Sequence, residues 1–257
     1  MGIPVPAEEG GSSLVSTTAL PAGFINQVNS LYPEKQNVKD ADFSKNSDLR
    51  VVGKNGAEVW VTYIGDGNFY LNNMNTYNSL MYYNYIESEL SSMNSLTPAT
   101  LHMTMLLPNT NQMYCPAGLK LQLLYWDGNQ YSKTFPEGTR IGFAVAREGY
   151  KCNGAPITDA SAYSFKRIIG STLYPQKDGD VRGNYYSTPQ LNQVGKSQAV
   201  TRWIEDYGYC VTGLDIRPIG NAKSDYDFND VLIAVSSSPI PDAIQPGTVI
   251  DLSLIHI

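Results

Sequence analysis

Hydrophobic and polar residues alternate with a period of two over much of the chain after residue 48. The segment 57–64 reads AEVWVTYI, and similar short runs follow it along the sequence. This period predicts strands, because successive side chains of a strand point to opposite faces of a sheet. The predicted strands span 57–64, 100–107, 119–125, 140–146, 163–169, 199–204, 209–216 and 230–235.

Turn-forming residues separate these runs, for example Gly-Asp-Gly at 65–67, Asp-Gly-Asn at 127–129 and Asp-Gly-Asp at 178–180. Short strands divided by such turns, with little helical periodicity, are typical of two-sheet β proteins. We therefore predict an all-β fold, an antiparallel β-sandwich of the jelly-roll-like kind.

One segment with a helical period precedes the strands, LPAGFINQVNSLYPE at 20–34. Pro21 stands where a first helical turn tolerates proline, and apolar residues recur at Phe24, Val28 and Leu31 before Pro33 ends the pattern. The pattern predicts a short N-terminal helix on the edge of the β domain.

The predicted organisation has five parts. Residues 1–19 form a linker, 20–47 the helix and a loop, 48–238 the sandwich, and 239–251 a Pro-punctuated linker to a further domain outside this chain. The last six residues, LSLIHI at 252–257, coincide with the translation of a common sequencing-adapter end. We interpret them as an artefact and leave His256 out of the chemistry.

Composition favours an extracellular β protein and excludes some partners. Charged residues make up 16% of the chain, which contains 18 Tyr and 22 Gly and has a net charge of −6. The acidity and the absence of a Lys/Arg run argue against nucleic-acid binding. No apolar stretch reaches 18 residues, so no transmembrane segment is predicted. We expect an extracellular or outer-membrane-surface location, with the export signal outside this sequence.

Three cysteines, Cys115, Cys152 and Cys210, lie far apart in the sequence. No CxxC spacing occurs among them, which argues against a zinc ribbon or a redox motif. Buried free thiols are the favoured interpretation, and a disulfide between two of the three is the alternative.

The strongest local motif is SDYDFND at 224–230, directly before the predicted strand VLIAV. Its oxygen-bearing side chains are Asp225, Asp227, Asn229 and Asp230, and Asp215 ends the preceding strand. Calcium takes six to eight oxygen ligands, so these five residues form a candidate Ca²⁺ site. The alternative is a solvated turn whose Asp and Asn side chains cap their own backbone.

Support for hydrolytic chemistry is weak. His102 is the only histidine left, and it lies within an apolar run that favours a core or cross-strand role. Glu58, Glu137 and Glu205 could serve a glycoside hydrolase, but no spacing marks a carboxylate pair. We therefore expect no enzyme, with a glycoside hydrolase as the least favoured function.

Aromatic residues offer an alternative function, a carbohydrate-binding module. Tyrosines at 82, 83, 85, 185 and 186, together with Trp126, could stack on sugar rings if they were exposed on a face of the sandwich. Packing in a core is the more common role of such residues.

Four segments occur in the order seen in LruC-domain proteins, exported surface proteins of Bacteroides-like bacteria that are often lipid-anchored. They are NSLMYYNY at 78–85, FPEGTRIGFAV at 135–145, YYSTPQLN at 185–192 and VTGLDIRP…SDYDFNDVLIAV at 211–235. The last segment also resembles a domain of unknown function with a closing D-x-D-F/Y-N-D motif.

This resemblance, over roughly residues 50–240, implies a β-sandwich, export and a calcium site. By position, Asp225, Asp227, Asn229 and Asp230 match the closing motif, Asp215 stands where the family usually has Glu, and Ile216 replaces the usual Asp. The expected function is that of a non-catalytic surface-lipoprotein module, calcium-bound, in adhesion or envelope assembly. Its expected partners are calcium and a surface glycan or protein.

Overall fold

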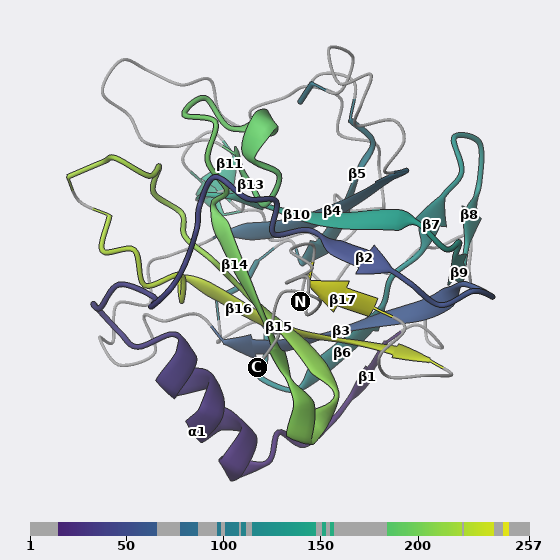
Figure 1. Ribbon diagram of the computed structural model, residues 1–257, viewed down its shortest axis with the longest axis horizontal. Helices are drawn as coiled ribbons and strands as arrows, with labels where there is room; N and C mark the ends of the chain where they lie inside the picture. The colour runs from purple at the N-terminus through teal and green to yellow at the C-terminus, as the bar shows by residue number, and fades with distance from the viewer. Residues whose placement is uncertain are drawn as a thin grey trace, which may run out of the picture.

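In the computed structural model of the protein, the residues described are 15–65, 78–86, 97–98, 101–107, 109–111, 115–147, 151–152, 155–156, 184–222, 224–238 and 244–246. Two antiparallel sheets pack face to face, and one helix, α1 (Ala22–Leu31), lies outside them (Figure 1). This arrangement confirms the predicted sandwich and the short N-terminal helix.

The first sheet has the strand order β1-β6-β3-β16-β15-β14, with β9 beside β3. Its strands are β1 (Val15–Thr17), β3 (Ala57–Gly65), β6 (Leu119–Gln122), β9 (Thr134–Phe135), β14 (Ala199–Ile204), β15 (Tyr209–Leu214) and β16 (Val231–Ser238). A 3-10 turn, Glu205–Tyr207, joins β14 to β15.

The second sheet has the order β17-β2-β10-β4-β5, with β13 beside β10. Its strands are β2 (Leu49–Val51), β4 (Ser79–Ile86), β5 (Met103–Leu107), β10 (Thr139–Ala146), β13 (Asn184–Tyr186) and β17 (Ile244–Pro246). A 3-10 turn, Pro189–Leu191, follows β13. Two small hairpins complete the structure, β7 (Tyr125–Trp126) with β8 (Tyr131–Ser132) and β11 (Lys151–Cys152) with β12 (Ala155–Pro156).

The main core lies between the two sheets and follows from the period-two pattern. On β3, the buried side chains of Val59, Val61 and Tyr63 share one face and pack into this core. Leu80 and Tyr82 of β4 do so from the second sheet. Because apolar area removed from water is the main stabilising contribution, these alternate positions account for the pairing of the two faces.

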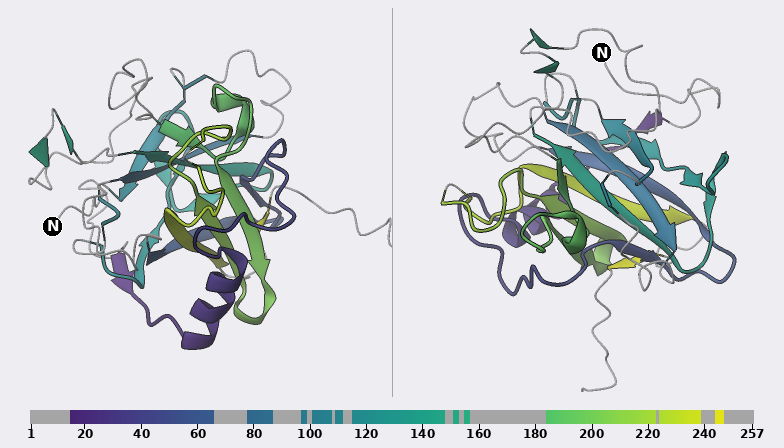
Figure 2. Two further views of the ribbon diagram at one scale, coloured as in Figure 1. Left: turned by 90° about the vertical axis from the view of Figure 1, so that its left-hand side faces the viewer. Right: turned by 90° about the horizontal axis from the view of Figure 1, so that it is seen from above.

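The outer face of the first sheet is also buried, where α1 packs on it. Phe24 and Val28 of α1 contact a second cluster that includes Val211, Leu232 and Ala234. In Figure 2 the helix lies against the strands of the β14–β15 hairpin. Burial on both faces explains why VLIAV in β16 reads as a continuous apolar run and not as an alternation.

Three of the tyrosines that the sequence offered as a sugar platform are buried on the outer face of the second sheet. Tyr83, Tyr85 and Tyr186 pack with methionines of β4 and β5 in a third cluster. Tyr82 and Tyr185 are buried as well. These five tyrosines are therefore core residues, and a platform built from them is ruled out for the structure described here.

Residues 15–47 pack on the sandwich. β1 pairs with β6, and α1 covers the first sheet. Residues 33–47, which we call the strap, follow α1. Two hydrogen bonds join the strap to β14 and to the residues just before it: the Ser197 N–H donates to the Phe43 carbonyl, and the Ser47 hydroxyl donates to the Ala199 carbonyl.

Cys115 and Cys210 are buried free thiols, as favoured, while the side chain of Cys152 lies outside the described residues.

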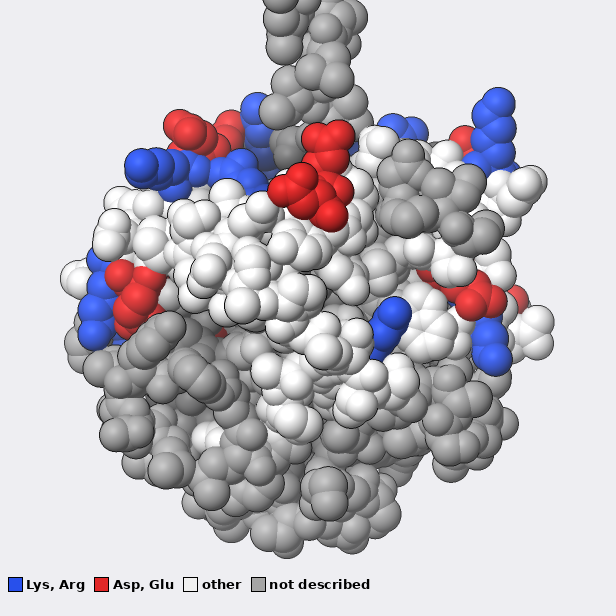
Figure 3. Space-filling view, turned by 90° about the horizontal axis from the view of Figure 1, so that it is seen from below, with Lys and Arg blue, Asp and Glu red and all other residues white. Residues whose placement is uncertain are grey.

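The described part of the lower face carries few charges. In Figure 3 its described atoms near the centre are mostly uncharged, with one basic side chain among them, and most other charged side chains lie toward the upper rim and the sides. This distribution fits a chain in which 16% of residues are charged. Among the described residues, no helix is long and apolar enough to cross a membrane.

Candidate functional site: the acidic loop

The candidate calcium residues lie in the connection between β15 and β16, residues 215–230, which we call the acidic loop; residue 223 is not described. Leu214 pairs with Val231, so the strand register places Asp215 and Asp230 side by side at the base of this loop. The loop projects at the opposite end of the sandwich from the β7–β8 hairpin (Figures 1 and 2).

The base of the loop is a buried network of carboxylates. Asp215 accepts hydrogen bonds from the Arg217 N–H at 2.7 Å and the Ser224 hydroxyl at 2.7 Å, and Asp230 accepts one from the Ile216 N–H at 2.9 Å. Burial raises the pKa of Asp215, and the nearby charge of Asp225 raises it further.

The tip of the loop is centred on Asp227, which is 2% exposed. Its carboxylate accepts hydrogen bonds from the Lys35 N–H at 2.9 Å and, more weakly, from the Asn229 N–H at 3.4 Å. The Asn229 amide in turn donates to Glu34 at 3.1 Å. Burial raises the pKa of Asp227 from 3.8 to about 6, and the charges of Asp225 and Glu34 oppose ionisation while the two N–H groups favour it.

The strap holds the loop in an unusual backbone conformation. Tyr226 and Phe228 both have positive φ, 55° and 53°, a region that L-residues with large side chains rarely adopt. Such a residue costs about 1–2 kcal/mol. Phe43 of the strap stacks on both rings, at centroid distances of 6.0 and 5.0 Å, and the Val38 N–H donates to the Tyr226 carbonyl at 3.0 Å. These contacts offset the cost and fix the loop.

The structure therefore brings all five predicted residues into one loop, in two groups. Asp215 and Asp230 form the base, Asp227 and Asn229 form the tip, and Asp225 is half-buried and acts electrostatically on Asp215 and Asp227. The sequence analysis missed Glu34, which lies almost 200 positions away. Only the packing of the strap reveals it, because no local pattern marks Glu34.

The ligand types and the negative charge of the acidic loop suit calcium, but its side chains are not arranged as a coordination shell. It supplies carboxylate, amide and hydroxyl oxygens, the ligands that Ca²⁺ prefers. Within the described ranges, however, no three Asp, Glu, His or Cys side chains converge as a metal centre requires. The oxygens of Asp215 and Asp227 accept from N–H and hydroxyl groups, so a calcium ion would have to displace some of these bonds.

The electrostatics of Asp227 predict a pH dependence of stability without added metal. Its pKa of about 6 in the folded state lies above 3.8, so the folded chain binds this proton more tightly than the unfolded chain does. The free energy of unfolding should fall as pH rises from 4 to 7, by at most about 3 kcal/mol for a shift of this size. Asp227→Asn should remove this part of the dependence. Denaturant unfolding of both proteins in chelator, at several pH values, checks it; parallel curves would show that Asp227 has an ordinary pKa.

The remaining sequence-based candidates are placed as follows. His102 is half-buried and contacts the β7–β8 hairpin, so it is not a core residue. Asp127 forms the predicted turn, where its carboxylate accepts from the N–H groups of Asn129 and Gln130 at 2.8 Å each. The turn aspartates 66, 178 and 180 lie outside the described residues.

The chain shows no significant match to any protein-family model, curated protein or solved structure. The resemblance to LruC-domain proteins therefore stays a hypothesis based on the four quoted segments.

Proposed function

We propose that this chain is a non-catalytic module of an exported surface protein, and that its acidic loop binds calcium. The observation that carries the proposal is the burial of two carboxylates, Asp215 and Asp227, near a third, Asp225. Asp215 and Asp227 are buried beside Asp225, and in the described part of the chain their hydrogen-bond donors are backbone N–H groups and a hydroxyl, with no Lys or Arg side chain among them.

Burying a carboxylate without a cationic partner is unfavourable, since the protein interior solvates charge poorly. Lys35 is the nearest strap cation in the sequence, but its ammonium is 3.8 Å from Glu34 and its side chain is 60% exposed. A divalent cation in the loop would offset the repulsion among Asp215, Asp225 and Asp227. It would also link the strap, through Glu34, to the connection between β15 and β16.

The surface role is supported by composition and resemblance. The chain has few charged residues and many Tyr, Gly and Asn residues, and Cys115 and Cys210 are buried free thiols. These features suit a β module whose stability comes from its core and not from disulfides. Adhesion or envelope assembly is the role that the resemblance implies. A loop that calcium stabilises fits an environment in which calcium is abundant.

Thermal melting with calcium, with magnesium and with chelator tests the site. Calcium at a hundredfold excess over Kd should stabilise the folded chain by about 2.7 kcal/mol, which corresponds to about 5–10 °C in Tm for a domain of this size. Asp227→Asn keeps a hydrogen-bond acceptor for the Lys35 N–H and removes the charge. This variant should melt higher than the wild type in chelator at pH 7.5, and calcium should no longer raise its Tm.

Asp127→Asn is the matched control, because Asp127 caps a turn with similar N–H bonds at the far end of the sandwich. It should keep the full calcium response. An equal calcium response in Asp227→Asn would remove the acidic loop from the site, and no response in the wild type would reduce the loop to a capped turn.

A further inference from the structure

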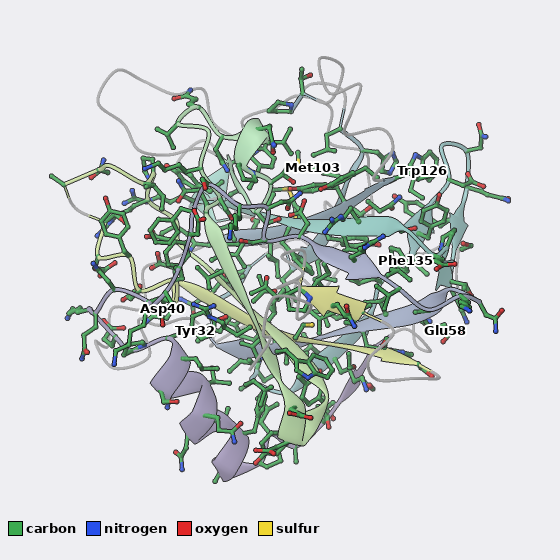
Figure 4. All side chains as sticks on the ribbon, viewed as in Figure 1. Tyr32, Asp40, Glu58, Met103, Trp126 and Phe135 are labelled. Atoms are coloured by element: carbon green, nitrogen blue, oxygen red, sulfur yellow. The ribbon has the colours of Figure 1, made fainter. Side chains whose placement is uncertain are left out.

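A second feature lies at the opposite end of the sandwich, where three aromatic rings meet under the β7–β8 hairpin. The rings belong to Trp126 of β7, Tyr131 of β8 and His102, which directly precedes β5. All three side chains are half-buried, so the cluster reaches the surface. Figure 4 shows Trp126 on the right-hand side of the molecule, far from Tyr32 and from Asp40 of the strap on the left.

Among the residues that the structure describes, one face of the indole has no aromatic neighbour. His102 stacks on Trp126 with a centroid distance of 4.1 Å and an interplanar angle of 18°, so it covers one face. Tyr131 lies 4.9 Å from Trp126 and 5.7 Å from His102. These three distances give an angle of about 78° at Trp126, which places Tyr131 beside the indole and not on its second face. Among the described residues, no other aromatic ring contacts Trp126.

The backbone that carries the indole is also held in position before any ligand arrives. The Asn84 side chain bonds to it twice: its amide nitrogen donates to the Trp126 backbone carbonyl at 2.9 Å, and its oxygen accepts from the Trp126 backbone N–H at 2.9 Å. The Tyr131 hydroxyl is fixed by His102 at 2.8 Å and Thr104 at 3.1 Å. A preorganised aromatic surface loses little conformational entropy on binding.

The surroundings of the cluster select the class of ligand. The β7–β8 hairpin exposes polar side chains: the amides of Asn129 and Gln130 in its turn, the hydroxyl of Ser132, and the charged groups of Asp127 and Lys133. Sites for small ligands combine an aromatic surface with a few polar groups that fix orientation. A pyranose ring matches this combination, because it offers C–H groups to the indole face and hydroxyls to the amides. A nucleic-acid base could stack as well, but its phosphates would be repelled by a chain with a net charge of −6.

From this geometry we propose that the second face of Trp126 is a binding platform for a neutral glycan, with the side chains of the β7–β8 turn bonding its hydroxyls. The platform is independent of calcium and lies at the other end of the sandwich from the acidic loop. It differs from the platform that the tyrosines would have formed, since those residues are buried.

Affinity electrophoresis of the full chain in gels containing starch, a mixed-linkage β-glucan, xylan, galactomannan or dextran tests this platform. At least one polysaccharide should retard the wild type, and Trp126→Ala should weaken the retardation at least tenfold. Trp203, 36% exposed on β14, provides the control: Trp203→Ala should stay within twofold of the wild type. Trp126→Tyr keeps an aromatic face and should retain part of the affinity if Trp126→Ala does not fold.

Fluorescence gives an independent reading. In the Trp60→Phe/Trp203→Phe variant, Trp126 is the remaining tryptophan, and its emission should shift on titration with the retarding polysaccharide. The proposal is overturned if no polysaccharide retards the folded wild type or if Trp126→Ala binds as well as the wild type. It is also overturned if Trp203→Ala loses as much affinity as Trp126→Ala. The same holds if sedimentation shows that Trp126→Ala abolishes self-association of the chain and leaves polysaccharide binding unchanged.

Discussion

Replacing Gly213 by alanine should lower the free energy of unfolding by about 3 kcal/mol. Gly213 lies in β15, paired with Val200 and Leu232 on its two sides. A Cβ atom at this position would stand 2.1 Å from the Phe228 carbonyl oxygen and 2.7 Å from the ring of Tyr32. The carbonyl belongs to the backbone of the acidic loop, so the clash cannot be relieved by rotating one side chain.

The same contact explains how helix and loop are joined to the sheet. The Tyr32 hydroxyl lies 2.9 Å from the Val200 carbonyl and 2.8 Å from the Val211 carbonyl, and it donates to one at a time. Burial raises the pKa of this phenol far above its usual value, so it stays protonated and keeps its donor. Alanine at 213 would push both Tyr32 and the loop away from β15.

Denaturant unfolding of Gly213→Ala checks this expectation. Ser236→Ala, at a half-buried position of β16 in the same sheet, should change stability by less than about 0.5 kcal/mol. Wild-type stability in Gly213→Ala would mean that the acidic loop does not approach β15 as described.

The second large effect concerns Asp48, a fully buried carboxyl just before β2. Three hydroxyls donate to it, from Tyr85 at 2.5 Å, from Thr188 at 2.6 Å and from Ser187. These bonds tie the end of the strap to the outer face of the second sheet and to the segment after β13. The sequence analysis gave Asp48 no role, since its partners lie far away in the chain.

Asp48→Ala should destabilise the protein by about 3–4 kcal/mol, because it leaves three buried hydroxyls without their acceptor and opens a cavity. Asp48→Asn keeps an acceptor oxygen and should cost less. Burial raises the pKa of Asp48, so the folded wild type takes up this proton more readily than the unfolded chain, and its advantage over Asp48→Asn should grow as pH falls.

Unfolding free energies of the wild type and both variants, measured between pH 4 and 8, check these expectations. Asp42→Ala, which removes a half-exposed strap carboxylate held by Ser44, is the control and should leave the free energy of unfolding close to that of the wild type. A loss below 1 kcal/mol in Asp48→Ala would show that the hydroxyl network contributes little to stability.

Local pattern predicted the elements whose residues carry a clear period. Helix α1 forms where Phe24 and Val28 recur, and β3, β10, β14 and β15 form where apolar and polar residues alternate or run together. The sequence analysis overlooked β4, because SLMYYNYI is buried on both faces and its tyrosines read as polar or apolar with equal ease. The predicted strand at 163–169 lies outside the described residues.

At the acidic loop, the residues contributed by distant parts of the chain could not be predicted from the sequence. The motif itself located Asp225, Asp227, Asn229 and Asp230, and the strand register placed Asp215 next to them. Neither Glu34 nor the Lys35 N–H could be found in this way, since the strap reaches the loop only after α1 has packed on the sheet. The positive φ of Tyr226 and Phe228 carries no sequence signal either, because glycine is the residue expected there.

The most direct test of the central claim is calorimetric titration of the chelator-treated full chain with calcium at pH 7.5. We predict one calcium ion per chain in the wild type, no detectable binding in Asp227→Asn, and much weaker heat with magnesium. Absence of calcium binding in the folded wild type, or unchanged binding in Asp227→Asn, would contradict the assignment of the acidic loop as a calcium site.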